Sequence, residues 1–329
     1  MKITGVKVRR QFVELLTDAG LTGIAIADAR AGGEVRRLVN DLLIGADPRN
    51  ASGLWEQMTA ANSAARRQAP VRKAIAVLDL ALWDLKAKAN DEPLWRTLGG
   101  ARPRANAYAS FDHPDADDEE LSRWFQRMAV DHGLRGGLLR VGADQAGNLR
   151  RLEIMRAALL RAGPAPSLMI DAGRSWSASQ AVDRVRALEE QFDLTWVEGM
   201  SGDRDARGLK RLSDSISGAV CIGAGFAAIS DFWPHLDERS ADIIQIDIGA
   251  MGITGVLQIA DAAFGLELPV TLSAAPGNIQ AQLAGVMPSF MSVEVKDPAP
   301  SSGNYVSDVR IEHGWAVAGD ALGNGLILK

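Results

Sequence analysis

Residues 242–264 read DIIQIDIGAMGITGVLQIADAAF, a short apolar run that passes directly into an amphipathic segment. The first part, 242–247, has the length and the isoleucine content of a buried strand. In the second part the apolar side chains recur at helical spacing and share one face: Ile253, Leu257, Ala260 and Phe264. A strand followed at once by a helix is the unit of parallel α/β folds, so this stretch favours an α/β protein.

The same alternation extends to both sides of this stretch, over residues 105–299. Short apolar strands are predicted at 105–109, 137–141, 167–171, 194–198, 219–223, 242–247, 268–272 and 290–295, with helical stretches between them. Eight such units predict a (β/α)8 TIM-like barrel. A doubly wound sheet is the structural alternative, but no glycine-rich dinucleotide fingerprint follows the first of these strands.

Residues 1–104 have a different organisation. Three strands are predicted at 2–9, 12–17 and 21–27, followed by helices at 34–44, 51–66 and 71–89. This order indicates a small α+β domain that caps the barrel. The tail, residues 300–329, holds no ninth strand–helix unit and is predicted to pack back on the capping domain. The predicted fold class is therefore α/β, a (β/α)8 barrel with an N-terminal α+β capping domain.

Composition argues against several classes of protein. The 36 Lys and Arg residues against 41 Asp and Glu residues give a net charge of −5, which argues against a nucleic-acid partner or binding to an anionic membrane. Cys221 is the only cysteine, so no internal disulfide can form. No apolar run reaches membrane-spanning length, and residues 1–10 follow a polar strand pattern rather than that of a signal peptide. These features predict a cytoplasmic protein.

Four stretches carry a resemblance to a known family. They are 17–21 (TDAGL), 74–100 (AIAVLDLALWDLKAKANDEPLWRTLGG), 242–255 (DIIQIDIGAMGITG) and 313–326 (HGWAVAGDALGNGL). Together they resemble the mandelate racemase/muconate lactonizing enzyme family of the enolase superfamily, along the whole chain. The resemblance implies removal of a proton α to a carboxylate, as in a racemase or an acid-sugar dehydratase. It also implies a Mg2+ cofactor, a small carboxylate or acid-sugar ligand, and a homo-oligomer.

In that family Mg2+ is held by three carboxylates at the ends of the third, fourth and fifth barrel strands, where it stabilises an enediolate intermediate. The resemblance places the first two metal ligands at Asp171 and Glu198, but the third position is occupied by Phe226. Two flanking positions differ as well, since Gly173 replaces an Asn and Gly199 replaces the second Glu of Glu-Glu-Pro. Mg2+ is costly to dehydrate, so two carboxylates alone are expected to hold it weakly.

The proton-transfer positions of the family are also changed. The second-strand Lys-x-Lys pair reads 138–140 (LLR), and Arg140 cannot act as a base because its pKa stays above about 12. The sixth-strand acid persists as Asp247, whereas the seventh-strand histidine position holds Ser273. Glu294 stands at the strand-eight acid position, and Lys296, two residues further on, is a candidate for a relocated base.

Two other features bear on the site. His113 is the one histidine predicted in a loop at the carboxyl ends of the strands, either as a proton-transfer group or as a solvated loop residue. The first two strands are joined through Arg10-Gln11, which leaves almost no room for the long specificity loop that the family carries there. The site is therefore expected to stay open to water, which weakens the stabilisation of an enediolate.

Two functions remain open at this point. In one, Asp171 and Glu198 hold a divalent metal, Arg140 binds the substrate carboxylate, and the acid and lysine positions of the sixth and eighth strands move protons. In the other, Arg140 bridges Asp171 and Glu198 in place of the missing cation, and Mg2+-dependent activity is lost or altered, which leaves a ligand-binding or oligomeric partner protein. Metal-free hydrolysis is disfavoured, because Arg140 is expected to keep both acids ionised.

Overall fold

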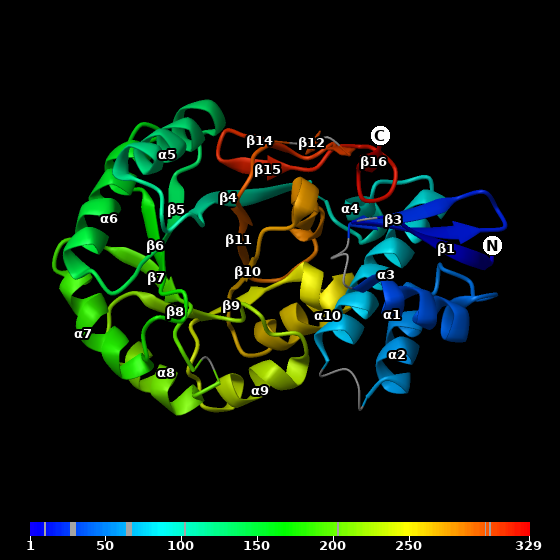
Figure 1. Ribbon diagram of the computed structural model, residues 1–329, viewed down its shortest axis with the longest axis horizontal. Helices are drawn as coiled ribbons and strands as arrows, with labels where there is room; N and C mark the ends of the chain where they lie inside the picture. The colour runs from blue at the N-terminus through cyan, green and yellow to red at the C-terminus, as the bar shows by residue number, and fades with distance from the viewer. Residues whose placement is uncertain are drawn as a thin grey trace.

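The structure is a computed structural model that describes residues 1–9, 11–26, 31–63, 68–101, 103–202, 204–299, 301–302 and 304–329. Its larger part is a closed barrel of parallel strands, seen end-on in Figure 1. The strands are β4 (Arg104–Phe111), β5 (Gly136–Arg140), β6 (Ser167–Asp171), β7 (Leu194–Glu198), β8 (Ala219–Ile222), β9 (Ile243–Ile246), β10 (Val270–Leu272) and β11 (Phe290–Val295). The last strand pairs with the first, Val293 opposite Ala107, so the predicted barrel is confirmed and the doubly wound sheet is wrong.

Helices surround the barrel strands. They are α5 (Asp118–His132), α6 (Gln145–Leu159), α7 (Ala178–Glu189), α8 (Ala206–Ser213), α9 (Ile229–Asp237) and α10 (Ile248–Phe264). The connection after β10 differs from the prediction, because it is the 3-10 helix η3 (Pro276–Leu283) rather than an α-helix. Gly277 and Asn278 have φ values of 71° and 54°, which a regular α-helix excludes.

The capping domain begins with an antiparallel sheet of β1 (Ile3–Arg9), β2 (Phe12–Thr17) and β3 (Thr22–Ile26). Its helices are α1 (Gly32–Leu38), the π-helical η2 (Val39–Leu43), α2 (Ala51–Ala61), α3 (Ala69–Ala89) and the short α4 (Leu94–Thr97). Arg9 pairs with Phe12, so the hairpin between the first two strands is short. Arg10, residue 27 of the third predicted strand and residues 64–66 of the second predicted helix lie outside the described residues.

The C-terminal strands run along one edge of the molecule, from the barrel to the capping domain (Figure 1, top). They are β12 (Ser301–Ser302), β13 (Tyr305–Ser307), β14 (Arg310–Glu312), β15 (Trp315–Val317) and β16 (Leu326–Leu328). The tail contacts both parts of the molecule. Strand β15 pairs with the barrel strand β4, and the Asn324 backbone N–H donates to Asp84 of α3 at 2.8 Å while its side-chain amide donates to the Ile24 carbonyl of β3.

Helix α3 is the main contact of the capping domain with the barrel helix α10. Asp79 of α3 is fully buried and accepts hydrogen bonds from the Thr254 backbone N–H at 2.8 Å and from the Thr254 hydroxyl at 2.7 Å. The Trp83 indole donates to the same hydroxyl at 2.9 Å. Gly252 interrupts α10 here with φ 69° and ψ 176°, a conformation open essentially only to glycine. The break brings the backbone of α10 against Asp79.

This buried carboxyl makes the stability of the protein depend on pH. Burial raises the pKa of Asp79 to about 7, against the hydrogen bonds from Thr254 that lower it. Because the unfolded chain has a carboxyl pKa near 4, the folded protein binds the proton more tightly. The stabilising contribution is therefore complete below about pH 4 and is lost as the pH rises through about 7.

We expect the free energy of unfolding to fall between about pH 5 and about pH 8, and Asp79→Asn to reduce that slope because asparagine does not titrate. Urea denaturation of both proteins at the two pH values measures the effect. The buried Asp84, whose pKa burial also raises, is present in both proteins and so does not contribute to their difference. An equal slope in the variant would assign the pH dependence to groups other than Asp79.

None of the helices described is both long enough and apolar enough to span a membrane.

Candidate ligand site at the barrel mouth

The predicted site residues meet at the carboxyl ends of the barrel strands. Side chains alternate along a strand, and the register pairs Arg140 with Asp171 and Asp171 with Glu198, so these three lie side by side on the inner face. They line a cavity of about 240 Å³ together with other predicted residues: Asp247, Glu294 and Lys296. Below it the barrel is filled by mostly apolar side chains: Tyr108, Leu138, Met169, Trp196, Cys221 and Ile243. Ligands of such barrels bind at this end.

Arg140 is held by two carboxylates. Its Nη2 lies 2.8 Å from Asp171 Oδ2 and 3.0 Å from Asp112 Oδ1. The sequence predicts that Arg140 bridges Asp171 and Glu198. The contact with Asp171 is present, but Asp112 takes the place of Glu198. The guanidinium turns toward Asp112 instead, in the loop after β4, since that carboxylate is 43% exposed and is less costly to approach than the buried Glu198.

Two glycines make room for this ion pair. Gly173 and Gly199 have φ values of 57° and 70°. A Cβ on Gly173 would lie 2.7 Å from Arg140 Nη1, and a Cβ on Gly199 would overlap Asp171 Oδ1. These are the positions at which the family resemblance predicts Asn and Glu. The chain therefore has glycine at both of these positions, where a side chain would collide with Arg140 or with its partner Asp171.

Glu198 lies at the base of the cavity and is 6% exposed. Its Oε2 accepts hydrogen bonds from the Trp196 indole at 2.9 Å and from the Gln245 amide at 3.1 Å. Burial, with the neighbouring carboxylates of Asp171 and Glu294, raises the pKa of Glu198 to about 8, against the two hydrogen bonds that lower it. The carboxyl is therefore mostly protonated at neutral pH in the unliganded protein.

Asp171 shows the same direction of shift. Burial raises the pKa of this carboxyl, and it outweighs the hydrogen bond from the Gly173 backbone N–H at 2.7 Å and the charge of Arg140. The expectation that Arg140 keeps both acids ionised is therefore wrong for Glu198, which the guanidinium does not contact. At Asp171 the guanidinium lowers the pKa but does not offset the desolvation of the carboxyl.

Lys296 is a cation in this cavity. Its Nζ lies 3.2 Å from Asp112 Oδ2 and 3.7 Å from Glu294 Oε1. Burial is the largest influence on its pKa and lowers it, but Glu294 and Asp112 outweigh burial and the net shift of the pKa is upward. A relocated base needs a lowered pKa, so this environment does not suit Lys296 for that role. Glu294 also accepts from the Ala274 backbone N–H at 2.9 Å.

Asp247 caps helix α10, since its side chain accepts from the Gly249 backbone N–H at 2.8 Å. Burial raises the pKa of this carboxyl despite hydrogen bonds from Gly249 and Ala250 that lower it. His113 does not line the cavity, and its ring packs on Phe111 with centroids 5.3 Å apart. In the described part of the chain, Asp247 therefore has no imidazole beside it.

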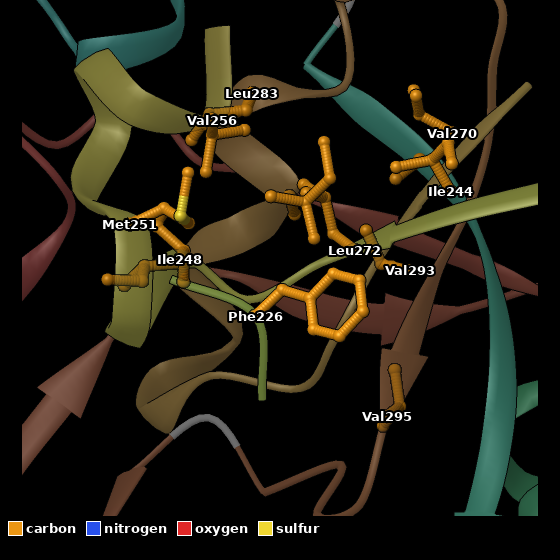
Figure 2. Close-up of a cluster of buried hydrophobic side chains, with 14 of the residues drawn as sticks. Phe226, Ile244, Ile248, Met251, Val256, Val270, Leu272, Leu283, Val293 and Val295 are labelled. Atoms are coloured by element: carbon orange, nitrogen blue, oxygen red, sulfur yellow. The ribbon is translucent and has the colours of Figure 1, made fainter. Parts of the chain in front are cut away.

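Phe226 follows β8 and points into the apolar core, not into the cavity. Its ring is buried, with centroids 4.9 Å from Phe232 and 5.5 Å from His235. Figure 2 shows the ring among aliphatic side chains such as Leu272 and Val293. Among the described residues, no three His, Cys, Asp or Glu side chains are grouped so that they could hold a metal ion.

The cavity is lined by barrel residues only. Its lining begins at Ser110, so no described residue of the capping domain closes over it. Sequence analysis missed Ser110, Asp112 and Gln245 as lining residues. A signal for each was present, because Ser110 and Asp112 continue the inward alternation of β4 beyond Tyr108, and Gln245 lies two residues before Asp247 on the same face of β9.

A closed (β/α)8 barrel with an α+β cap and acidic side chains at its mouth defines a class of ligand-binding barrels. The sequence places the chain within that class more narrowly. Residues 3–99 match the model of the mandelate racemase/muconate lactonizing enzyme N-terminal domain, and residues 120–329 match the model of the enolase C-terminal domain-like family. The chain therefore belongs to the mandelate racemase/muconate lactonizing enzyme family of the enolase superfamily.

Known members of the family resemble the chain over most of its length. It is 28% identical to the L-talarate/galactarate dehydratase of Salmonella typhimurium over 282 residues, which are 80% of this chain and 69% of the relative. The crystal structure of L-talarate dehydratase from Polaromonas sp. JS666, complexed with Mg and L-glucarate, superposes with a TM-score of 0.84 at 26% identity and covers 97% of this chain and 85% of that one. The 3,6-anhydro-D-galactonate cycloisomerase of Zobellia galactanivorans shares the fold, with a TM-score of 0.88, 22% identity and coverage of 100% and 97%.

Proposed function

We propose that this chain is a metal-independent member of the family, which binds a small hydroxylated molecule at the barrel mouth and has lost Mg2+-dependent removal of an α-proton. The relatives act on acid sugars, and the 240 Å³ cavity suits a molecule of that size. The resemblance implies a carboxylate or acid sugar as ligand. The proposed loss of metal-dependent activity does not depend on the charge of the ligand.

The observation that carries this proposal is the ion pair between Arg140 and Asp171, at 2.8 Å. It occupies one of the two carboxylates that the resemblance assigns to the metal, while Phe226 lies in the apolar core. Glu198 alone remains, and it is buried and hydrogen-bonded to Trp196 and Gln245. Mg2+ prefers several oxygen ligands in octahedral geometry, so these residues do not fit it.

The residues for proton transfer support the same conclusion. Arg140 remains protonated at any physiological pH. Lys296 lies beside two carboxylates that favour its charged form, and Asp247 caps a helix without an imidazole partner among the described residues. Among the described residues that line the cavity, no lysine or histidine is therefore placed to act as an uncharged base. The alternative function is an isomerase or dehydratase that uses a divalent metal in a rearranged site, and it predicts strong metal binding.

Calorimetric titration of Mg2+ and Mn2+ into chelator-treated protein separates the two functions. We expect no stoichiometric binding below about 1 mM by the wild type. Arg140→Met keeps an unbranched, flexible side chain but removes its charge, so it should increase Mg2+ affinity, and addition of Phe226→Glu should increase it further. Arg135→Met is the matched control, since this exposed arginine lies at the opposite end of β5 and should leave metal affinity unchanged.

Thermal melting of each variant shows whether it is folded, which is essential for the buried position 226. Stoichiometric binding by the wild type well below about 1 mM would exclude the proposed function and favour the metal-dependent alternative. A parallel test is incubation of the wild type with gluconate and glucarate in D2O with Mg2+. Deuterium exchange at the carbon next to the carboxylate, followed by NMR, would likewise exclude the proposal.

A further inference from the structure

The lining of the mouth cavity carries more acid than base. Five carboxyl groups line it, against two cations: Asp112, Asp171, Glu198, Asp247 and Glu294, with Arg140 and Lys296. Even without Glu198, which is mostly protonated at neutral pH, the carboxyl groups outnumber the cations by four to two. In a partly enclosed cavity such an excess attracts positive charge. A divalent metal would neutralise it, but under the proposed function no metal is held. The inference made here therefore rests on that proposed function.

Both cations are paired with carboxylates of the cavity. Arg140 Nη2 binds both Asp171 and Asp112, at 2.8 and 3.0 Å. Lys296 Nζ lies 3.2 Å from Asp112 and 3.7 Å from Glu294. A carboxylate on a ligand would compete with these carboxylates for the two cations and would lie close to several carboxyl groups. Both effects oppose the binding of an acid sugar.

The remaining polar atoms that face the cavity are mainly acceptors. Gln245 is 2% exposed and uses its Nε2 to donate to Glu198, which leaves its Oε1 without a hydrogen-bond partner among the described residues. Ser110 is 5% exposed, and no described residue binds its hydroxyl. Buried polar atoms without a protein partner are expected to bind a ligand or water. An acceptor such as Gln245 Oε1 requires a ligand that donates.

We infer that the barrel mouth binds a small hydroxylated amine, an amino-polyol or amino sugar, rather than an acid sugar. Its ammonium group lies between Glu294, Asp247 and the Gln245 carbonyl oxygen, and its hydroxyls bind Ser110 and the outer carboxylates. An ammonium group supplies three donors and one positive charge, which match the acceptors and the charge of this cavity. The cavity of about 240 Å³ admits a chain of six carbons.

Three probes with the same six-carbon chain test the charge of the ligand directly: glucamine (1-amino-1-deoxysorbitol), sorbitol and gluconate. Calorimetric titration at pH 7 should give a dissociation constant for glucamine at least about tenfold lower than for sorbitol, and weaker binding still for gluconate. Glu294→Gln and Asp247→Asn remove charge with little change of shape, and each should reduce the preference for glucamine over sorbitol. Asp261→Asn, an exposed position on α10, is the matched control and should leave it unchanged.

Thermal melting confirms that each variant is folded, and the two acid positions provide independent tests. Gluconate binding as tight as that of glucamine, or binding of none of the three probes at about 10 mM, would overturn the inference. The Mg2+ titration described above separates this result from failure of the proposed function. If gluconate is preferred and the wild type binds no metal, the ligand class is wrong and metal independence stands. If the wild type binds Mg2+ stoichiometrically, the proposed function fails as well.

Discussion

Gly252→Ala should lower the free energy of unfolding by about 4 kcal/mol. At φ 69° and ψ 176° a residue with a Cβ is strained by about 1–3 kcal/mol. The added methyl would also lie 2.6 Å from Asp79 Oδ2 and 2.9 Å from Asp79 Cβ. Asp79 is fully buried and is bound to Thr254, so it has little room to move. Thermal and urea denaturation measure the loss, which should lower the melting temperature by about 6 °C.

Gly33→Ala is the matched control for this prediction. Gly33 lies in helix α1, and a Cβ there would meet no atom within 4 Å. Alanine is a better helix former than glycine, so this variant should be more stable than the wild type by up to about 1 kcal/mol. A Gly252→Ala protein with the stability of the wild type would show that the contact between α3 and α10 adapts to the methyl group.

The strand pattern alone predicts the barrel with small errors at its ends. Predicted strands 167–171, 194–198 and 290–295 coincide with β6, β7 and β11. Strand β10 is shorter than the predicted 268–272, because Pro269 has no N–H for the ladder. The break in α10 at Gly252 could not be predicted, since 248–264 keeps its helical periodicity while the backbone turns at one residue to contact Asp79 of the capping domain.

The candidate site was predictable as a set of residues but not as a set of pairs. Alternation along parallel strands fixes that Arg140, Asp171 and Glu198 lie together. The partner of Arg140 depends on the loop after β4, where Asp112 lies, and loop conformation has no period to detect. The sign of the pKa shift at Asp171 also depends on burial, which outweighs the adjacent guanidinium. The sequence shows which ionisable groups lie together, but whether the pKa of each group is raised or lowered depends on how deeply the group is buried.

Gly199→Ala should disrupt the ion pair at the barrel mouth. The added Cβ would overlap Asp171 Oδ1, so the carboxylate must move away from the Gly173 backbone N–H and from Arg140 Nη2. Strain at φ 70° adds to this effect. We expect a loss of stability of about 3–4 kcal/mol in urea denaturation. Affinity for glucamine should fall at least about tenfold, because the displaced Asp171 no longer offsets the repulsion between the Arg140 guanidinium and the ammonium group.

Gly202→Ala separates strain from overlap. Gly202 lies three residues further along the same loop with φ 80°, but a Cβ there would meet no atom within 4 Å. This control should therefore lose only about 1–2 kcal/mol and keep its ligand affinity. A double-mutant cycle with Asp171→Ala isolates the overlap, because Gly199→Ala should then be no more destabilising than Gly202→Ala. Gly199→Ala could instead lower the free energy of unfolding as much in the Asp171→Ala background as in the wild type. Backbone strain rather than displacement of Asp171 would then explain the loss of stability, and Gly199 would have no special role in making room for the ion pair.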